Sequence, residues 1–229
     1  KILMSKTAGT VKRVSMELGG HAPFIVFEDA DLDEAVIGAM ANKYRNSGQV
    51  CVSANRIYVH ENIYDEFSNR LAEKSSQLKV ADGRTEGAQI GPLITPQAFK
   101  KVEEHVEDAV EKGAKVLTGG TNDNSGVQFY KPTVLTEINN NMKIYYEETF
   151  GPVAPIIKFK DENEVIEMAN DTKYGLAGYF YSRDIGKIWR VAEALEYGMV
   201  GINAGVISTE VAPFGGIKES GIGLSLIHI

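Results

Sequence analysis

The sequence has one cysteine, seven prolines and no long hydrophobic run. A single cysteine excludes an intrachain disulfide framework and a cysteine-rich zinc site. No stretch reaches the run of about 18 to 20 apolar residues that a membrane-spanning helix needs, and the first residues do not form a secretory signal peptide. We therefore expect a soluble, cytoplasmic protein with no membrane partner.

Basic charge is also scarce, with 24 Lys and Arg against 31 Asp and Glu and a formal net charge of −7. Without a basic tract, the chain has no surface typical of nucleic-acid binding. Its 43% hydrophobic and 24% charged residues are ordinary for a globular protein. At roughly 150 residues per domain, 229 residues amount to one large domain or slightly more.

Two periodicities alternate along the chain, and together they predict an α/β fold. Helical spacing of apolar residues occurs in five segments: 31–44, 62–78, 95–112, 161–170 and 184–197. Short runs rich in β-branched and aromatic residues lie at 23–27, 56–60, 115–117, 153–159, 177–182 and 199–203. This alternation favours βαβ units and a largely parallel sheet flanked by helices.

Local signals mark some of the ends of these segments. Asp31 is a plausible N-cap of the first helix, and Gly113 is a natural stop for the third. The last helical segment places five apolar residues on one face, among them Ile185 and Trp189. The Gly- and Asn-rich segment 118–126 is typical of a surface loop.

Cys51 and Glu17 are the first candidates for chemistry. Cys51 lies in a loop of small and polar residues, which suits a thiolate nucleophile that a substrate must approach. A buried, inert thiol is the alternative. Glu17 interrupts a mainly apolar run, residues 14–18, and precedes Gly19 and Gly20, so it is a candidate general base. Alternatively it is a solvated residue at a strand edge.

Glu148, Phe150 and Arg45 are further candidates. Glu148 and Phe150 precede a Gly-Pro turn, where a carboxylate could bind sugar hydroxyls and a ring could stack; an ordinary acidic loop is the alternative. Arg45 lies six residues before Cys51. It is either a favourable charge at a helix C-terminus or a bidentate partner for a substrate carboxylate.

Several other active-site patterns are missing. The sequence contains no G-x-S-x-G elbow, no Walker loop and no G-x-G-x-x-G. The glycine-rich stretch 214–221 is more typical of a tight loop than of a phosphate cradle. The four histidines, at positions 21, 60, 105 and 228, show no metal-ligand spacing, so we expect no metal site.

Taken together, four short motifs in order make the chain resemble the NAD(P)-dependent aldehyde dehydrogenase family. They are Met16-Glu17-Leu18-Gly19-Gly20, Gly48-Gln49-Val50-Cys51, Glu148-Thr149-Phe150-Gly151-Pro152 and Pro213-Phe214-Gly215-Gly216. The resemblance covers about residues 1–223. It implies an oxidoreductase that uses NAD or NADP and a small aldehyde, and a parent protein that forms homo-oligomers.

The resemblance also implies a role for each candidate residue. Cys51 would attack the aldehyde, giving a thiohemiacetal and then a thioester, and its backbone N–H would stabilise the oxyanion. Glu17 would activate water to hydrolyse the thioester. Leu18 and Gly19 would pack against the nicotinamide, Glu148 would hold the nicotinamide ribose, and Phe150 would line the nicotinamide pocket.

Within this family the chain resembles the succinate-semialdehyde dehydrogenases most. The resemblance rests on the loop 44–49 and the run 207–214. It implies that Arg45 and Ser208 bind the far carboxylate of the substrate. Because this substrate is an anion and the protein is net acidic, a local cation is needed to attract it. A dehydrogenase for another small aldehyde, such as glutarate semialdehyde, and an inactive fragment remain the alternatives.

The same resemblance predicts the domain organisation. Residues 1–19 would be the C-terminal remnant of a coenzyme-binding domain that lies mostly before this sequence, and residues 20–223 the catalytic domain and return segment. Residues 224–229 are similar to a translated sequencing adaptor, so we expect a non-native tail there. The isolated chain is expected to be inactive.

Overall fold

The fold is given by a computed structural model that describes residues 1–209 and 211–223. The predicted non-native tail, residues 224–229, lies outside the described residues. The α-helices are α1 (Ile2–Ala8), α2 (Leu32–Tyr44), α3 (Tyr64–Ser76), α4 (Pro96–Glu111), α5 (Lys143–Tyr146), α6 (Glu162–Asn170) and α7 (Ile185–Ala194). The short 3-10 helices are η1 (Arg45–Gly48) and η2 (Glu61–Ile63).

The strands form one large sheet and two small ones. They are β1 (Met16–Glu17), β2 (Ala22–Val26), β3 (Ala54–His60), β4 (Lys115–Thr118), β5 (Thr133–Thr136), β6 (Val153–Phe159), β7 (Tyr174–Gly175), β8 (Ala177–Tyr181), β9 (Met199–Ile202), β10 (Ile217–Lys218) and β11 (Gly221–Ile222). The seven-stranded sheet has the order β4-β5-β6-β3-β2-β8-β9. Adjacent strands in this sheet are parallel, except β4 and β5, which are antiparallel. This confirms the predicted α/β fold with a largely parallel sheet.

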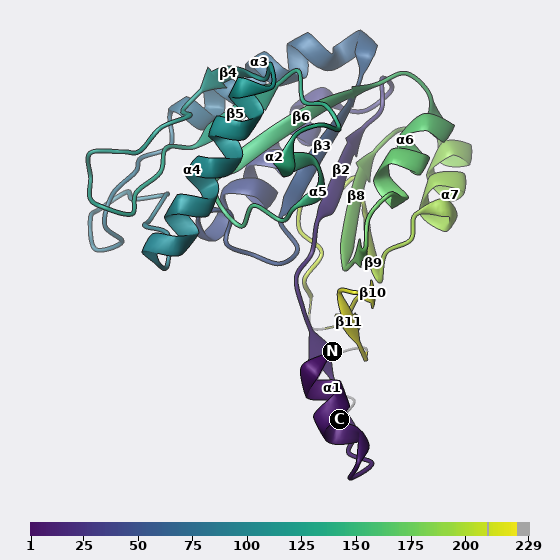
Figure 1. The fold of residues 1–229 in the computed structure, drawn as a ribbon. Coiled ribbons are helices and arrows are strands. Elements are labelled where there is room, and N and C mark those ends of the chain that lie inside the picture. Colours follow the sequence, from purple (N-terminus) through teal and green to yellow (C-terminus); the bar gives the residue numbers. More distant parts are fainter. Residues whose placement is uncertain (210, 224–229) are drawn as a thin grey trace.

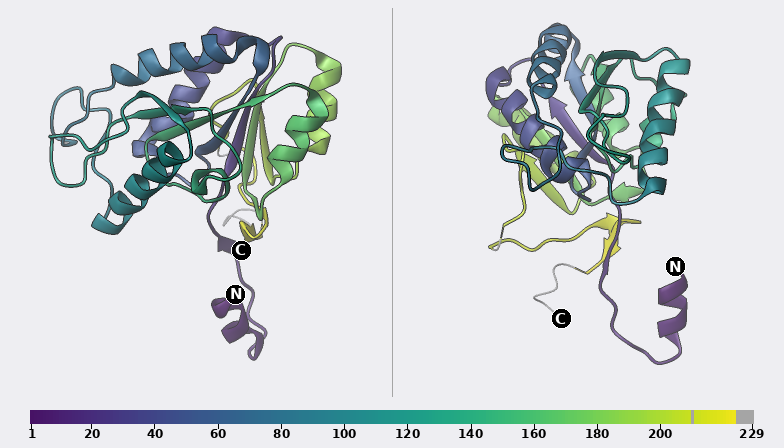
Figure 2. Two further views of the ribbon diagram at one scale, coloured as in Figure 1. Left: turned by 45° about the horizontal axis from the view of Figure 1, so that its top comes forward. Right: turned by 90° about the vertical axis from the view of Figure 1, so that its left-hand side faces the viewer.

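Helices cover both faces of this sheet, as the right-hand view of Figure 2 shows. Side chains alternate along each strand, so Phe24 and Val26 of β2 pack with α2 and α3 on one face. Ile25 and Phe27 point to the other face, where α4, α6 and α7 contribute to a second core. The sheet is therefore buried on both sides, which explains why its strands appear in the sequence as apolar runs.

Most predicted helix boundaries are confirmed. The Asp31 side chain accepts the Glu34 N–H at 3.2 Å as the cap of α2, and Gly113 follows α4 with φ of +102°. Helix α7 is shorter than predicted and ends at Ala194. Its apolar face is only partly covered, since Ile185 and Trp189 are 69% and 64% exposed. Among the described residues, no helix is long and apolar enough to cross a bilayer.

The two ends of the described chain lie together below the sheet (Figure 1). Strand β1 pairs antiparallel with β11, Met16 opposite Ile222 and Glu17 opposite Gly221. Strand β1 thus takes its partner from a segment about two hundred residues later in the sequence. Helix α1 stands away from the sheet and buries none of its residues.

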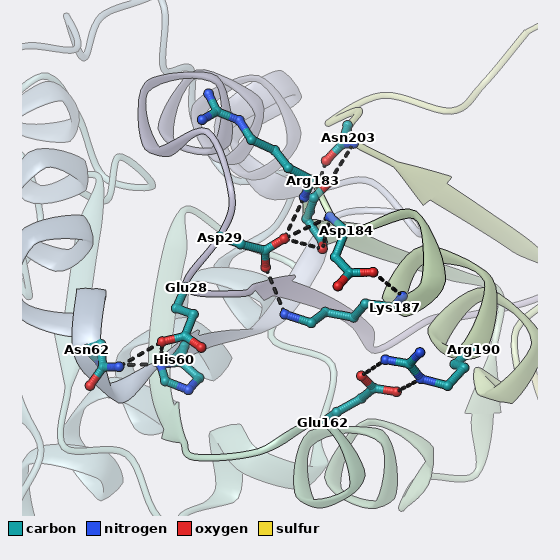
Figure 3. Close-up of polar contacts among 11 residues, drawn as sticks. Glu28, Asp29, His60, Asn62, Glu162, Arg183, Asp184, Lys187, Arg190 and Asn203 are labelled. Atoms are coloured by element: carbon teal, nitrogen blue, oxygen red, sulfur yellow. Dashed lines mark hydrogen bonds and ion pairs between the residues drawn. The ribbon is translucent and has the colours of Figure 1, made fainter.

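At the carboxyl ends of β2 and β8, Asp29 joins two loops (Figure 3). Its carboxylate accepts the Ser182 hydroxyl at 2.7 Å, the backbone N–H groups of Arg183 and Asp184 at 2.7 and 2.9 Å, and the Lys187 ammonium at 2.9 Å. These contacts tie the loop before α2 to the loop before α7. Cys51 precedes the amino end of β3, so it lies at the opposite edge of the sheet.

Candidate active site

A strained turn between α2 and β3 positions Cys51 at the amino end of β3. Asn46, Ser47 and Gly48 follow α2 with φ values of +51°, +57° and +73°, three left-handed residues in succession. Gly48 also lies so close to Gly151 that an added Cβ would meet the Gly151 carbonyl oxygen at 2.1 Å. Only glycine fits there, and the reversal leaves Cys51 half-buried with a free thiol.

Two side chains fasten this turn to the segment 91–94. The Ser47 hydroxyl accepts the Gly91 N–H at 2.9 Å and donates to the Gly91 carbonyl at 3.1 Å. The Gln49 amide oxygen accepts the Ile94 N–H at 2.9 Å. These contacts hold the segment that carries Cys51 in one position, which a catalytic group would require.

The turn opens onto a cavity of about 470 Å³. Its walls contain six of the eight residues that the sequence assigned to the site: Glu17, Leu18, Gly19, Cys51, Glu148 and Phe150. They come from three distant segments, since β1, the turn before β3 and the loop before β6 meet only in the fold. The structure thus brings the candidate nucleophile, base and cofactor-binding residues to one surface.

The surroundings of Cys51 disfavour its thiolate. Burial raises the pKa of the Cys51 thiol, and the nearby carboxylates of Glu148 and Glu17 raise it further. The backbone N–H groups of Cys51 and Val52 act in the opposite direction. The thiol therefore needs a proton acceptor, and Glu17 is an exposed carboxylate on the same cavity wall.

Glu148 is held with one oxygen fixed. The Gly20 N–H donates to its Oε1 at 2.9 Å, and a Cβ added at Gly19 would meet Oε2 at 2.8 Å. Burial raises the pKa of Glu148, while the Gly20 bond opposes this. Within the described part of the chain, Oε2 has no hydrogen-bond partner. A carboxylate with one oxygen fixed and one available suits a ribose hydroxyl, and Leu18 and Phe150 offer apolar walls beside it.

The loop that carries Glu148 is held by two buried histidines. His21 Nε2 lies 3.1 Å from the Glu147 carbonyl, and burial keeps the pKa of His21 well below its usual value, so the ring is neutral and donates one N–H. His105 Nδ1 lies 3.1 Å from the Thr149 hydroxyl. Phe150 takes a left-handed conformation with φ of +56° and lines the cavity.

Arg45 and Ser208 lie apart from this cavity. Arg45 borders a second space of only about 10 Å³, together with Val50, Val52 and the segment 205–207. Because Val50 and Val52 flank Cys51, this space lies beside the candidate nucleophile, and it is large enough for about one water. Ser208 follows that segment, is exposed, and does not border the space.

The fold adds one residue that the sequence did not reveal. Lys101 of α4 borders the 470 Å³ cavity, and its charge lowers the pKa of Glu148. No local motif marks it, since it is one of two adjacent lysines on an amphipathic helix. In residues 1–209 and 211–223, no cluster of three His, Cys, Asp or Glu side chains is placed to hold a metal ion.

Comparison with known proteins identifies the class that this fold and cavity define. Residues 1–228 match the aldehyde dehydrogenase family, and the chain belongs to this family. It is 58% identical over 221 residues to the succinate-semialdehyde dehydrogenase (NADP(+)) GabD of Escherichia coli, covering 96% of this chain and 46% of that protein.

Other relatives are equally similar and carry different names. A glutarate-semialdehyde dehydrogenase of Pseudomonas putida is 59% identical, over 96% of this chain and 46% of that protein. The crystal structure of succinate-semialdehyde dehydrogenase from Burkholderia pseudomallei superimposes with a TM-score of 0.96 at 59% identity, covering 97% of this chain and 46% of that chain. The chain thus spans somewhat less than half the length of these relatives.

Proposed function

We propose that this chain is the nucleophile-bearing part of a dehydrogenase that oxidises a small anionic aldehyde, with succinate semialdehyde as the preferred substrate and succinate as the product. The observation that carries the proposal is the single cavity that joins Cys51, Glu17 and Glu148. Because the chain spans 46% of its relatives, the activity is proposed for the full-length protein that contains it, which we expect to be a homo-oligomer.

The first step is attack by the sulfur of Cys51 on the aldehyde carbon. Glu17 accepts the thiol proton, which is needed because burial and two carboxylates raise the pKa of Cys51. The resulting thiohemiacetal carries an oxyanion, which the Cys51 backbone N–H stabilises by a hydrogen bond. The turn at residues 46–48 holds sulfur and N–H in a fixed relation during this step.

A nicotinamide cofactor, NAD or NADP, supplies the hydride acceptor that converts the thiohemiacetal into a thioester. Glu148 is proposed to bind its ribose through the available Oε2, while Leu18, Gly19 and Phe150 pack against the ring. The exposed Glu17 first releases the thiol proton to solvent. It then takes a proton from a water molecule that attacks the thioester carbon, and returns this proton to the Cys51 sulfur as the thioester bond breaks. The acid leaves and the Cys51 thiol is restored.

Arg45 supports the proposed substrate class, an aldehyde that carries a carboxylate. The protein has a net charge of −7, so an anionic aldehyde needs a local cation, and Arg45 borders the space beside Val50 and Val52. We propose that the exposed side chains of Arg45 and Ser208 bind the far carboxylate of the substrate. Glutarate semialdehyde, longer by one methylene group, is the second candidate, supported by the equal similarity to its dehydrogenase.

Two substitutions in the full-length protein test the mechanism. Cys51→Ala should abolish aldehyde oxidation. At about pH 9, where solvent can take the thiol proton, Glu17→Gln should still give one burst of reduced cofactor, followed by a steady state about a hundredfold slower, because hydrolysis of the thioester still needs the base. Stopped-flow absorbance of the reduced cofactor measures both phases. A Cys51→Ala protein with full activity would overturn the proposal.

A third substitution tests the substrate class. Arg45→Ala should lower kcat/KM for succinate semialdehyde by about a hundredfold through the loss of a charge-assisted contact, and leave that for butyraldehyde, which has no carboxylate, nearly unchanged. Comparing succinate and glutarate semialdehyde with the unaltered protein decides between the two candidates. Equal losses with the neutral and the anionic aldehyde would show that Arg45 does not bind the carboxylate.

A further inference from the structure

The segment that carries the nucleophile is held by side chains. Ala54, three residues after Cys51, begins β3. Its N–H donates to the Asn42 side-chain oxygen at 2.6 Å, and its carbonyl accepts the buried Lys43 ammonium at 2.8 Å. Two neighbouring residues of α2 thus satisfy both backbone groups of Ala54 and fix where the strand begins.

The other end of the Asn42 amide reaches the substrate side of the nucleophile. Asn42 is 6% exposed, and its Nδ2 donates to the Gly205 carbonyl at 2.8 Å. Gly205 packs directly on α2, since a Cβ there would meet the Gly38 carbonyl oxygen at 2.3 Å. Val206 and Ile207 follow and border the space next to Arg45. Asn42 therefore sets the distance between the nucleophile segment and this wall.

A second asparagine makes the corresponding link on the cofactor side. Asn55 is 1% exposed; its Nδ2 donates to the Ser53 carbonyl at 3.1 Å, and its Oδ1 accepts the Thr149 N–H at 3.2 Å. Thr149 directly follows Glu148 on the cavity wall. Asn55 therefore connects the nucleophile segment to the proposed ribose-binding carboxylate.

We propose that Asn42 and Asn55 are positioning residues with separate tasks, Asn42 controlling how the aldehyde binds and Asn55 how the nicotinamide cofactor binds. This inference rests on the proposed function. An asparagine side chain both donates and accepts, so each amide satisfies a backbone N–H on one side and a carbonyl on the other. Each is buried, so its loss leaves backbone groups unpaired and lets one wall shift relative to Cys51.

The test uses Asn42→Ala and Asn55→Ala in the full-length protein. We expect Asn42→Ala to raise KM for succinate semialdehyde about tenfold, with little change in cofactor affinity. Asn55→Ala should weaken NADP+ binding, measured by isothermal titration calorimetry without aldehyde, by about tenfold, with little change in aldehyde KM. Asn42→Ser and Asn55→Ser, which keep a small polar group, replace the alanine variants if those do not fold.

Asn170 provides a matched control. Its amide also bridges two backbone groups, donating to the Ala194 carbonyl at 2.8 Å and accepting the Glu196 N–H at 2.9 Å, but it lies at the end of α6, away from the cavity. Asn170→Ala should lower thermal stability and leave both binding constants unchanged. Equal changes of both constants in the Asn42 and Asn55 variants, or none in either, would overturn the inference.

Failure of the proposed function is separable from failure of this inference. If the unaltered protein oxidises neither semialdehyde, the proposed function fails. The calorimetry still compares NADP+ binding between the unaltered protein and Asn55→Ala. Protection of Cys51 from iodoacetamide by succinate semialdehyde likewise compares aldehyde binding with Asn42→Ala. If Asn55→Ala does not weaken cofactor binding, or Asn42→Ala does not weaken aldehyde binding, the inference fails by itself.

Discussion

The thiol of Cys51 shares its cavity with the carboxyl groups of Glu17 and Glu148, and their charges oppose its ionisation. Burial raises the pKa of Cys51, and the charges of Glu148 and Glu17 add to this. Replacing Glu17 by Gln removes one negative charge and should shift the pH profile of Cys51 alkylation to lower pH. In the unaltered protein the midpoint of this pH profile should lie above the usual thiol pKa of about 8.5.

Rates of iodoacetamide labelling measure this shift. They are determined from about pH 6 to about pH 10, the range in which thiols titrate. Glu73→Gln, which removes an exposed carboxylate from the middle of α3, controls for the change in net charge. An unchanged profile in Glu17→Gln would mean that the Glu17 carboxylate does not act on the thiol.

The residues found from the sequence are those with local signals. Cys51 and Glu17 stand out because of the small and glycine-rich neighbours that their positions need. Asn42, Asn55 and Lys101 could not be found in this way. Asn42 and Asn55 contact segments 163 and 94 residues away, and Lys101 borders a cavity. Nothing in the surrounding sequence indicates such contacts.

At the scale of elements, Asp29 connects the β2–α2 and β8–α7 loops. Burial alone would raise its pKa, but hydrogen bonds from Lys187, Ser182 and two backbone N–H groups outweigh this and hold the pKa of Asp29 well below its usual value. A carboxyl with a depressed folded-state pKa stabilises the fold above its unfolded pKa, and this stabilisation is lost as the pH falls towards the folded value.

Asp29→Asn should therefore lower the free energy of unfolding by about 1 to 3 kcal/mol at neutral pH. The difference from the unaltered protein should shrink below about pH 4. Urea denaturation at several pH values measures it. Asp33→Asn is the control, since the Asp33 side chain is 81% exposed in its pair with Arg70 and should matter by less than about 1 kcal/mol. Equal effects of both substitutions would contradict this role.

The elements themselves were predicted unevenly. Helices with clear caps, such as α2 and α4, have the expected boundaries. The sequence did not indicate β5 or α5, each of four residues, because four residues span barely one helical turn or two alternations of a strand, too few for a repeating pattern to stand out. The pairing of β1 with β11 could not be predicted either, since it joins residues about two hundred positions apart.

At the scale of the whole molecule, helix α1 leaves an apolar surface uncovered. A cavity of about 700 Å³ lies between α1, β1 and β11, and Ile2 and Leu3 are 74% and 65% exposed. Apolar surface of this kind binds hydrophobic dyes. The isolated chain should bind anilinonaphthalene sulfonate, and Ile2→Ser with Leu3→Ser should reduce the dye fluorescence.

The same double substitution should leave the melting temperature of the sheet unchanged, because α1 buries none of its residues. Calorimetry of the isolated chain measures this. Val127→Ser, which changes a 91% exposed residue of a distant loop, should alter neither the dye signal nor the Tm. A large fall in Tm for the α1 variant would mean that the helix packs on the sheet in solution.

The antiparallel pair of β1 and β11 has a topological consequence. Met16 and Ile222 are paired neighbours, so the chain enters and leaves the seven-stranded unit at the same point. The chain of such a unit can be cut in another loop and its two original ends joined here, without moving a strand. A circular permutant that links these two positions and begins in the exposed loop at residues 121–127 should therefore retain the sheet.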